Sequence, residues 1–143
     1  MTILNQLAPY AHWFMRLTIP SVFIFHGVLK FMNLEGFSQM LNLSVPVMTL
    51  VALAEVVGGG LILLGGLSRD QKSDLMTRVG ALVCIPVLLG AIALFHWGRW
   101  NFVPAEGFPM GGMEFQVTML LICIYLLVKG NNINAGVVPQ GAS

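Results

Sequence analysis

Charged side chains are scarce in this sequence: they make up 9% of its 143 residues, against about 25% in an average soluble protein. The formal net charge is only +1, so no basic surface for nucleic acid is expected. The two cysteines form neither a C-x-x-C pair nor a metal-ligand spacing. The composition therefore excludes an ordinary soluble domain and predicts no nucleic-acid partner.

Hydrophobic residues are abundant, at 57%, and gather in four stretches at about residues 9–30, 46–67, 79–98 and 111–128. A bilayer core about 30 Å thick needs about 20 helical residues. The fourth is continuously apolar only over residues 115–128 and approaches this length only when residues 110–114 are counted. Within a bilayer the backbone must satisfy its own hydrogen bonds, so each stretch should be a helix. The predicted fold class is all-α, a four-helix transmembrane bundle forming one domain over residues 1–143.

The distribution of lysine and arginine predicts the orientation. No secretory signal peptide is apparent, so the first span is expected to remain as an anchor. The segments 33–45, 68–78 and 99–113 are expected to be connections, and the tail after Lys129 to be loosely ordered. Five basic residues then lie on the face of the termini and two on the other, which places both termini in the cytoplasm. The five are Arg16, Arg69, Lys72, Arg78 and Lys129; the two are Lys30 and Arg99.

The first span carries four ionisable residues on one stripe. At about 100° per residue, His12, Arg16, His26 and Lys30 fall within an arc of roughly 80°. This predicts a polar-lined face turned into the bundle. A plainer interpretation is that Arg16 and Lys30 extend to opposite headgroup regions, but it leaves His26 unexplained.

Glu55 lies near the middle of the second span and shares a face with Gly59 and Gly66, where a neighbouring backbone can approach closely. Counting about 1.5 Å per residue puts Glu55 roughly 13 Å and His26 roughly 9 Å from the outer boundary, with Arg16 near 24 Å. His26 is therefore the expected partner of Glu55, and Arg16 the second. The alternative is a purely structural carboxylate that ties helices together.

Spans three and four add His96 and Glu114 on the same outer side. The inward stripe of the fourth span is expected to run from Glu114 through Thr118, Leu121 and Tyr125. Cys123 would then face lipid, and both Cys84 and Cys123 are interpreted as packing residues rather than a redox pair. Among the histidines and carboxylates of this outer side (His26, Glu55, His96 and Glu114), no pair has i, i+3 or i, i+4 spacing, so no metal site is predicted. The candidates for ligand or quinone binding, or for proton relay, are Arg16, His26, Lys30, Glu55, His96 and Glu114.

Several short motifs, in this order, resemble those of the DoxX family of small four-helix membrane proteins. They are Arg16; His26-Gly27-x-x-Lys30-Phe31; Glu55-x-x-Gly58-Gly59, leading to Leu67-Ser68-Arg69; His96; and Gly111-Gly112-Met113-Glu114. The resemblance covers about residues 16–130. The ending Gly130-Asn131-Asn132-Ile133-Asn134 departs from the Gly-Pro-Gly ending that is frequent in the family.

The resemblance implies a four-span inner (plasma) membrane protein with both termini inside. It also implies membrane redox work, since family members include a subunit of thiosulfate:quinone oxidoreductase and partners of oxidative-stress enzymes. A related eukaryotic branch acts in cargo export, so roles without catalysis remain open.

Three functions follow as hypotheses. The first is a quinone-interacting or accessory subunit of a membrane redox complex, in which His26 and Glu55, with Arg16 or Lys30, bond the quinone and carry protons. The chain has no flavin, haem or iron–sulfur motif, so no cofactor is expected in the chain itself and electrons would come from a partner. The second is a membrane scaffold or assembly partner, and the third an oligomeric small-molecule transporter. The expected partners are the bilayer and either a second protein or further copies of the chain.

Overall fold

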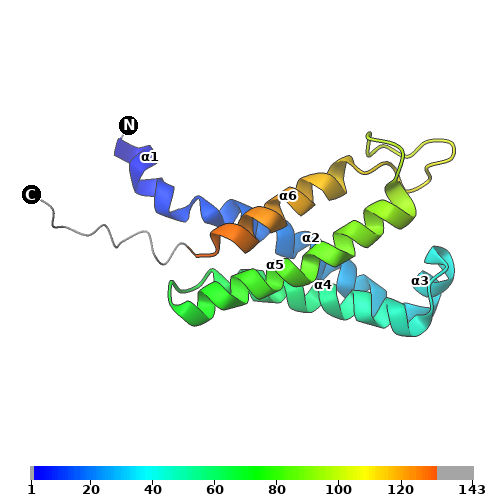
Figure 1. Cartoon of the computed structure of the whole chain (residues 1–143), viewed down its shortest axis with the longest axis horizontal. Helices are drawn as coiled ribbons and strands as arrows, with labels where there is room; N and C mark the ends of the chain where they lie inside the picture. The colour runs from blue at the N-terminus through cyan, green and yellow to red at the C-terminus, as the bar shows by residue number, and fades with distance from the viewer. Residues whose placement is uncertain (1, 132–143) are drawn as a thin grey trace, which may run out of the picture.

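The computed structural model describes residues 2–131, and within them all regular structure except one isolated β-bridge is helical. Four long helices run side by side along the molecule, and two short ones lie at its ends (Figure 1). In chain order the elements are α1 (Thr2–Leu7), η1 (Ala8–Tyr10), α2 (His12–Met32), α3 (Leu34–Leu41), α4 (Val45–Gly65), α5 (Gln71–Ala91), the π-helical turn η2 (Ile92–His96) and α6 (Glu114–Lys129).

Three helical segments are long and apolar enough to cross a membrane: His12–Met32, Val45–Gly65 and Gln71–His96. They confirm the first three predicted spans, although the third begins eight residues early. Helix α6 has 16 residues, which corresponds to about 24 Å. It begins at Glu114 rather than at residue 111 because Gly111 adopts a positive φ of 76° that a right-handed helix does not allow.

The prediction that residues 33–45 and 68–78 are connections was wrong in part, because both segments contain helix. Asn33 accepts a hydrogen bond from the amide of Gly36 at 3.0 Å and so begins α3 inside the predicted 33–45 connection. Asp70 accepts from the amide of Ser73 at 2.8 Å and begins α5. That backbone bond, with one from the Ser68 hydroxyl, lowers the pKa of the Asp70 carboxyl. Both are N-cap signals that extend helices into polar sequence.

Helix α4 packs between α2 and α5 through glycine contacts, as its glycine-rich face predicted. A Cβ on Gly59 would lie 3.0 Å from Ile24 of α2, and one on Gly58 would lie 2.6 Å from the sulfur of Cys84 in α5. A Cβ on Gly80 of α5 would lie 2.7 Å from the carbonyl oxygen of Gly58. The backbones therefore approach as closely as small-residue interfaces of membrane helices permit.

The buried face of α6 differs from the predicted one. Met119, Cys123 and Leu126 are buried in the core cluster, whereas Thr118, Leu121 and Tyr125 are exposed. The orientation of Cys123 was thus wrongly predicted, because Glu114 lies at the helix start and does not set the inward face. Cys84 and Cys123 are both fully buried in this cluster, which supports their role in packing.

Many large apolar side chains point outward from the long helices. Leu50 is 66% exposed on α4, Leu82 is 56% exposed on α5 and Leu121 is 62% exposed on α6. Apolar surface on this scale is not left in water by soluble monomers. These helices therefore form a multi-pass membrane protein whose outer surface contacts lipid.

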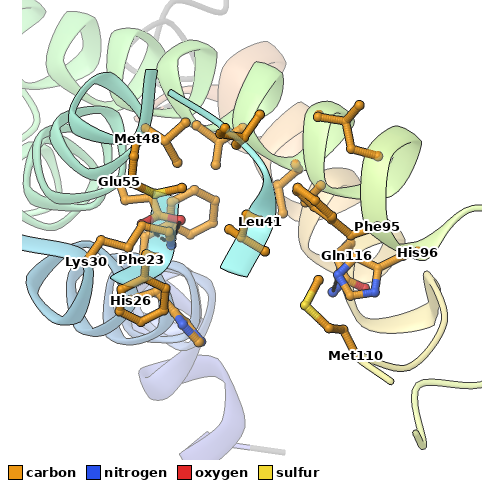
Figure 2. A pocket seen from close by; sticks show the side chains of 18 of the residues that line it. Phe23, His26, Lys30, Leu41, Met48, Glu55, Phe95, His96, Met110 and Gln116 are labelled. Atoms are coloured by element: carbon orange, nitrogen blue, oxygen red, sulfur yellow. Dashed lines mark hydrogen bonds and ion pairs between the residues drawn. The ribbon is translucent and has the colours of Figure 1, made fainter. Parts of the chain in front are cut away.

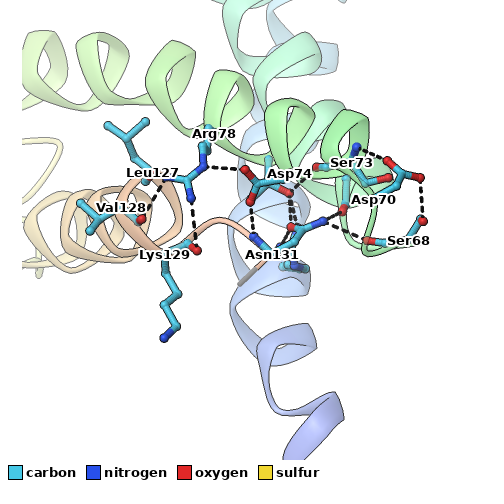
Figure 3. Close-up of polar contacts among 12 residues, drawn as sticks. Ser68, Asp70, Ser73, Asp74, Arg78, Leu127, Val128, Lys129 and Asn131 are labelled. Carbon is cyan, nitrogen blue, oxygen red and sulfur yellow. Dashed lines mark hydrogen bonds and ion pairs between the residues drawn. The ribbon is translucent and has the colours of Figure 1, made fainter. Parts of the chain in front are cut away.

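Arg78 of α5 joins the end of α6 to the bundle (Figure 3). Its Nε donates to Asp74 Oδ2 at 2.8 Å, and its Nη1 donates to the carbonyl oxygens of Leu127 at 2.7 Å and Val128 at 2.9 Å. A cation at the last carbonyls of a helix satisfies groups that have no partner within it. The tail after Lys129 was predicted to be loosely ordered, but Asn131 is held in place, because its backbone amide donates to Asp74 Oδ1 at 2.6 Å. Residues 132–143 lie outside the described part.

Candidate functional site

Lys30 and Glu55 form a buried ion pair between α2 and α4. The Lys30 Nζ lies 2.8 Å from Glu55 Oε1 and 2.7 Å from Oε2, and the two residues are 8% and 7% exposed. Glu55 was expected to pair with His26 and then Arg16, and that expectation was wrong. The structure confirms only that its partner comes from the first span.

The direction of helical side chains explains why Lys30 is the partner. In a helix the Cα–Cβ bonds tilt toward the N-terminus. Lys30 near the end of α2 therefore points back into the bundle, and Glu55 in the antiparallel α4 points out toward it. Gly27, one turn before Lys30, brings the helices together: a Cβ there would lie 2.9 Å from the carbonyl oxygen of Ala52 and 3.0 Å from the Cβ of Glu55.

The ion pair borders a cavity of about 480 Å³ at the end of the bundle covered by α3 (Figure 2). Its wall is built from α2, α3, α4, α5, η2 and α6 and is mostly apolar, with Phe23, Leu41, Met48, Phe95 and Met110 among the lining side chains. Five polar side chains interrupt this wall: His26, Lys30, Glu55, His96 and Gln116. An apolar cavity of this size with a few polar groups is typical of a small-molecule site.

His96 and Gln116 form the polar group on the wall away from the ion pair. His96 Nδ1 lies 3.0 Å from the carbonyl oxygen of Gly111, and its Nε2 lies 2.9 Å from Gln116 Nε2. Because a carbonyl oxygen only accepts, Nδ1 carries the proton and Nε2 accepts from the Gln116 amide. Gln116 Oε1 is then a buried acceptor with no partner within residues 2–131. A buried acceptor without a donor is costly, so the Gln116 amide would gain from a donor, which can reach the covered Oε1 only after the side chain turns toward the cavity.

The loop before α6 holds this group in place. The amides of Gly112 and Met113 donate to the carbonyl oxygens of Asn101 at 2.8 Å and Arg99 at 2.9 Å, which folds the loop back on itself. A Cβ on Gly112 would overlap the Arg99 carbonyl, so only glycine fits there. His96 itself ends the π-helical turn η2, a distortion often found at functional sites.

Four of the six predicted candidates meet at the cavity: His26, Lys30, Glu55 and His96. His26 is exposed at its rim and makes no hydrogen bond among the described residues. Glu114 does not line the cavity; it accepts from the amide of Phe102 at 3.2 Å. Arg16 lies at the opposite end of the bundle, in contact with Thr77 and Asn131.

Gln116 was not among the predicted site residues, because only ionisable side chains stand out in an apolar span. An uncharged amide in an apolar helix is a weaker signal, and only its position beside His96 reveals its importance. The cavity can offer donors from Lys30 and His26 and acceptors from Gln116 and His26 to a ligand with a polar head and an apolar body. Among residues 2–131, no three His, Cys, Asp or Glu side chains are grouped as metal ligands would be.

Comparison with known proteins gives one result. The family model DoxX matches residues 11–97, which cover α2 to η2 and include both members of the ion pair. No curated protein and no solved structure matches the chain.

Proposed function

This chain belongs to the DoxX family. On that premise we propose that it binds a quinone in the cavity beside Lys30 and Glu55, as an accessory subunit of a membrane redox complex. In this proposal α6 is a fourth, short span, and the protein lies in the inner (plasma) membrane with both termini in the cytoplasm. Arg69 and Lys72 lie at the turn from α4 into α5, and Lys129 ends α6. These helix ends lie together at one end of the bundle (Figure 1), which supports this orientation.

The observation that carries the proposal is the unpartnered acceptor Gln116 Oε1, which belongs to a residue lining a cavity that is otherwise largely apolar. A quinone has a flat ring with two oxygens and an apolar tail, and its reduced form has two hydroxyl donors. The cavity volume of about 480 Å³ falls within the range of small-molecule sites. A hydroxyl donor would satisfy Gln116 once its amide turned toward the cavity, and the apolar wall would cover the ring and the start of the tail.

Lys30 and His26 would bind the other polar atom of the ligand. The ammonium group of Lys30 has three protons, of which two bond the oxygens of Glu55. Glu55 thereby fixes the ammonium group at the cavity wall. His26 at the rim is the group that can accept and release a proton near neutral pH. When bound, the quinone would supply an acceptor for electrons and protons.

A scaffold role is the second candidate, and the mutual satisfaction of Lys30 and Glu55 favours it. Both carboxylate oxygens are bonded by the ammonium group, so the pair joins α2 to α4 without any ligand. A scaffold would need this pair and the glycine contacts but not the free acceptor on Gln116. The experiment must therefore perturb Gln116 rather than the pair.

The test is titration of the purified protein with a short-tailed quinone analogue, followed by fluorescence quenching or calorimetry. Gln116→Met removes the acceptor and keeps the volume, so quinone affinity should fall about tenfold, the value of roughly one buried hydrogen bond. Gln39→Met is the matched control, since Gln39 is exposed on α3 and does not line the cavity. Quinone extracted from the purified protein should be lost in parallel with affinity.

His26→Gln gives a second readout, because an amide bonds a carbonyl but carries no proton near neutral pH. This variant should retain quinone binding and lose partner-dependent turnover. Absence of saturable quinone binding by the wild-type protein would refute the quinone site. A stable protein partner retained without quinone would instead favour the scaffold.

A further inference from the structure

A second cavity, also of about 480 Å³, lies at the end of the bundle opposite the quinone candidate site. It is enclosed by η1, the start of α2, the end of α4 with the following turn, and the end of α6. Its lining includes three permanent cations and a histidine, but no carboxylate: Arg16, Arg69, Lys129 and His12. The side chains that line the cavity therefore carry a net positive charge.

Arg16 is the buried member of this set, with 1% of its surface exposed. Its guanidinium donates to His12 Nδ1 at 3.0 Å, the carbonyl oxygen of Ile62 at 2.9 Å, Thr77 Oγ1 at 2.8 Å and Asn131 Oδ1 at 2.6 Å. All four acceptors are neutral, and they use four of the five guanidinium donors. The positive charge is thus solvated by dipoles but not balanced by a bonded anion.

The nearby carboxylates are engaged elsewhere (Figure 3). Asp74 accepts from Arg78 at 2.8 Å and from the amide of Asn131 at 2.6 Å, so its charge is offset by Arg78. Asp70 accepts from Ser68 and from the amide of Ser73. Residues 132–143 contain no aspartate or glutamate, so no further acidic side chain can come from them.

We propose that this second cavity binds a phosphate group, supplied by the headgroup of an anionic phospholipid at the membrane surface. Arginine and lysine together are the usual ligands of phosphate, and basic pockets between helix ends are known to hold anionic lipid headgroups. The cavity lies where α2 begins and α4 and α6 end, which is the level of the lipid phosphates for membrane-spanning helices. Leu7 and Tyr10 beside it are 56% and 64% exposed, as expected of residues immersed in the interface.

The test uses the full chain in detergent, with lipid binding followed by native mass spectrometry. Phosphatidylglycerol should bind more tightly than phosphatidylcholine, by at least about tenfold. Lys129→Gln and Arg69→Gln should each weaken phosphatidylglycerol binding about fivefold, since one basic residue near a membrane surface contributes roughly that factor. Lys72→Gln is the matched control: Lys72 is exposed at the same end but does not line the cavity, so its loss should change binding less than twofold.

A parallel arm adds excess inorganic phosphate. If phosphatidylglycerol stays bound in excess phosphate, the ligand of the cavity is the lipid headgroup. If phosphate displaces the lipid from the wild-type protein but not from Lys129→Gln, the cavity binds soluble phosphate instead. Equal affinity for the two lipids with no effect of phosphate would overturn the proposal, as would equal losses in Lys129→Gln and Lys72→Gln. Quinone binding at the other end should be unchanged in these variants, which separates this test from that of the proposed function.

Discussion

Removal of Lys30 should expose how much the bundle depends on the ion pair. In Lys30→Met the carboxylate of Glu55 loses both of its hydrogen bonds, at 2.7 and 2.8 Å, while remaining 7% exposed. Methionine retains the length of the side chain, so little packing is lost. The dominant effect is an uncompensated buried charge, for which the expected loss in free energy of unfolding is about 3–5 kcal/mol.

The converse change should cost less. In Glu55→Met the orphaned charge belongs to Lys30, which lies two residues from the end of α2 and can extend its ammonium group toward the headgroups. In the double variant both charges are absent, and two apolar side chains of similar size face each other. Replacement of a buried pair in this way is often neutral or stabilising. The double variant should therefore be more stable than Lys30→Met, and the two single effects should not add.

The assay is unfolding of the purified protein in mixed micelles by increasing SDS, followed by circular dichroism, for wild type and the three variants. Lys72→Met serves as the control for loss of a lysine at an exposed position. A loss below about 1 kcal/mol in Lys30→Met would refute the reasoning, as would additive effects in the double variant. Either result would mean that the pair does not hold α2 against α4.

Two further outcomes follow from the packing and the orientation. Gly27→Ala should destabilise the bundle by about 1–3 kcal/mol in the same assay, because its Cβ would meet the α4 backbone. Gly60→Ala is the control: no atom lies within 4 Å of its added Cβ, so it should be neutral or stabilising. Equal effects of the two substitutions would contradict the close contact at Gly27. Reporter fusions after Asp70 and after Lys129 should both be cytoplasmic and a fusion after Glu106 periplasmic, and a periplasmic signal at Asp70 would reverse the proposed orientation.

Composition and periodicity were sufficient to predict the helical fold. Apolar stretches of about 20 residues have few solutions other than helices in a bilayer, so three spans could be placed within a few residues except at the start of the third. The short motifs also indicated the family. Their physical meaning appeared only in the structure: Gly27 brings α2 to α4, one turn from Lys30, and Gly111 supplies the carbonyl oxygen that orients His96.

Helix ends were harder to predict from the sequence, because they depend on single hydrogen bonds. The caps at Asn33 and Asp70 extended helices into polar segments, and the positive φ of Gly111 shortened α6. Hydrophobicity averaged over a span does not register such local chemistry.

The sequence by itself determined that this is a helical membrane protein and which ionisable residues its helices carry. Only the tertiary structure decided which of them meet. Counting residues along each helix placed Glu55 nearest His26, but side-chain direction and the close contact at Gly27 paired it with Lys30. The same packing turned Arg16 into the second cavity, where its guanidinium bonds Thr77 and Asn131 instead of Glu55. Axial position follows from sequence spacing, whereas side-chain length, tilt and the rotation of each helix are fixed by packing against its neighbours.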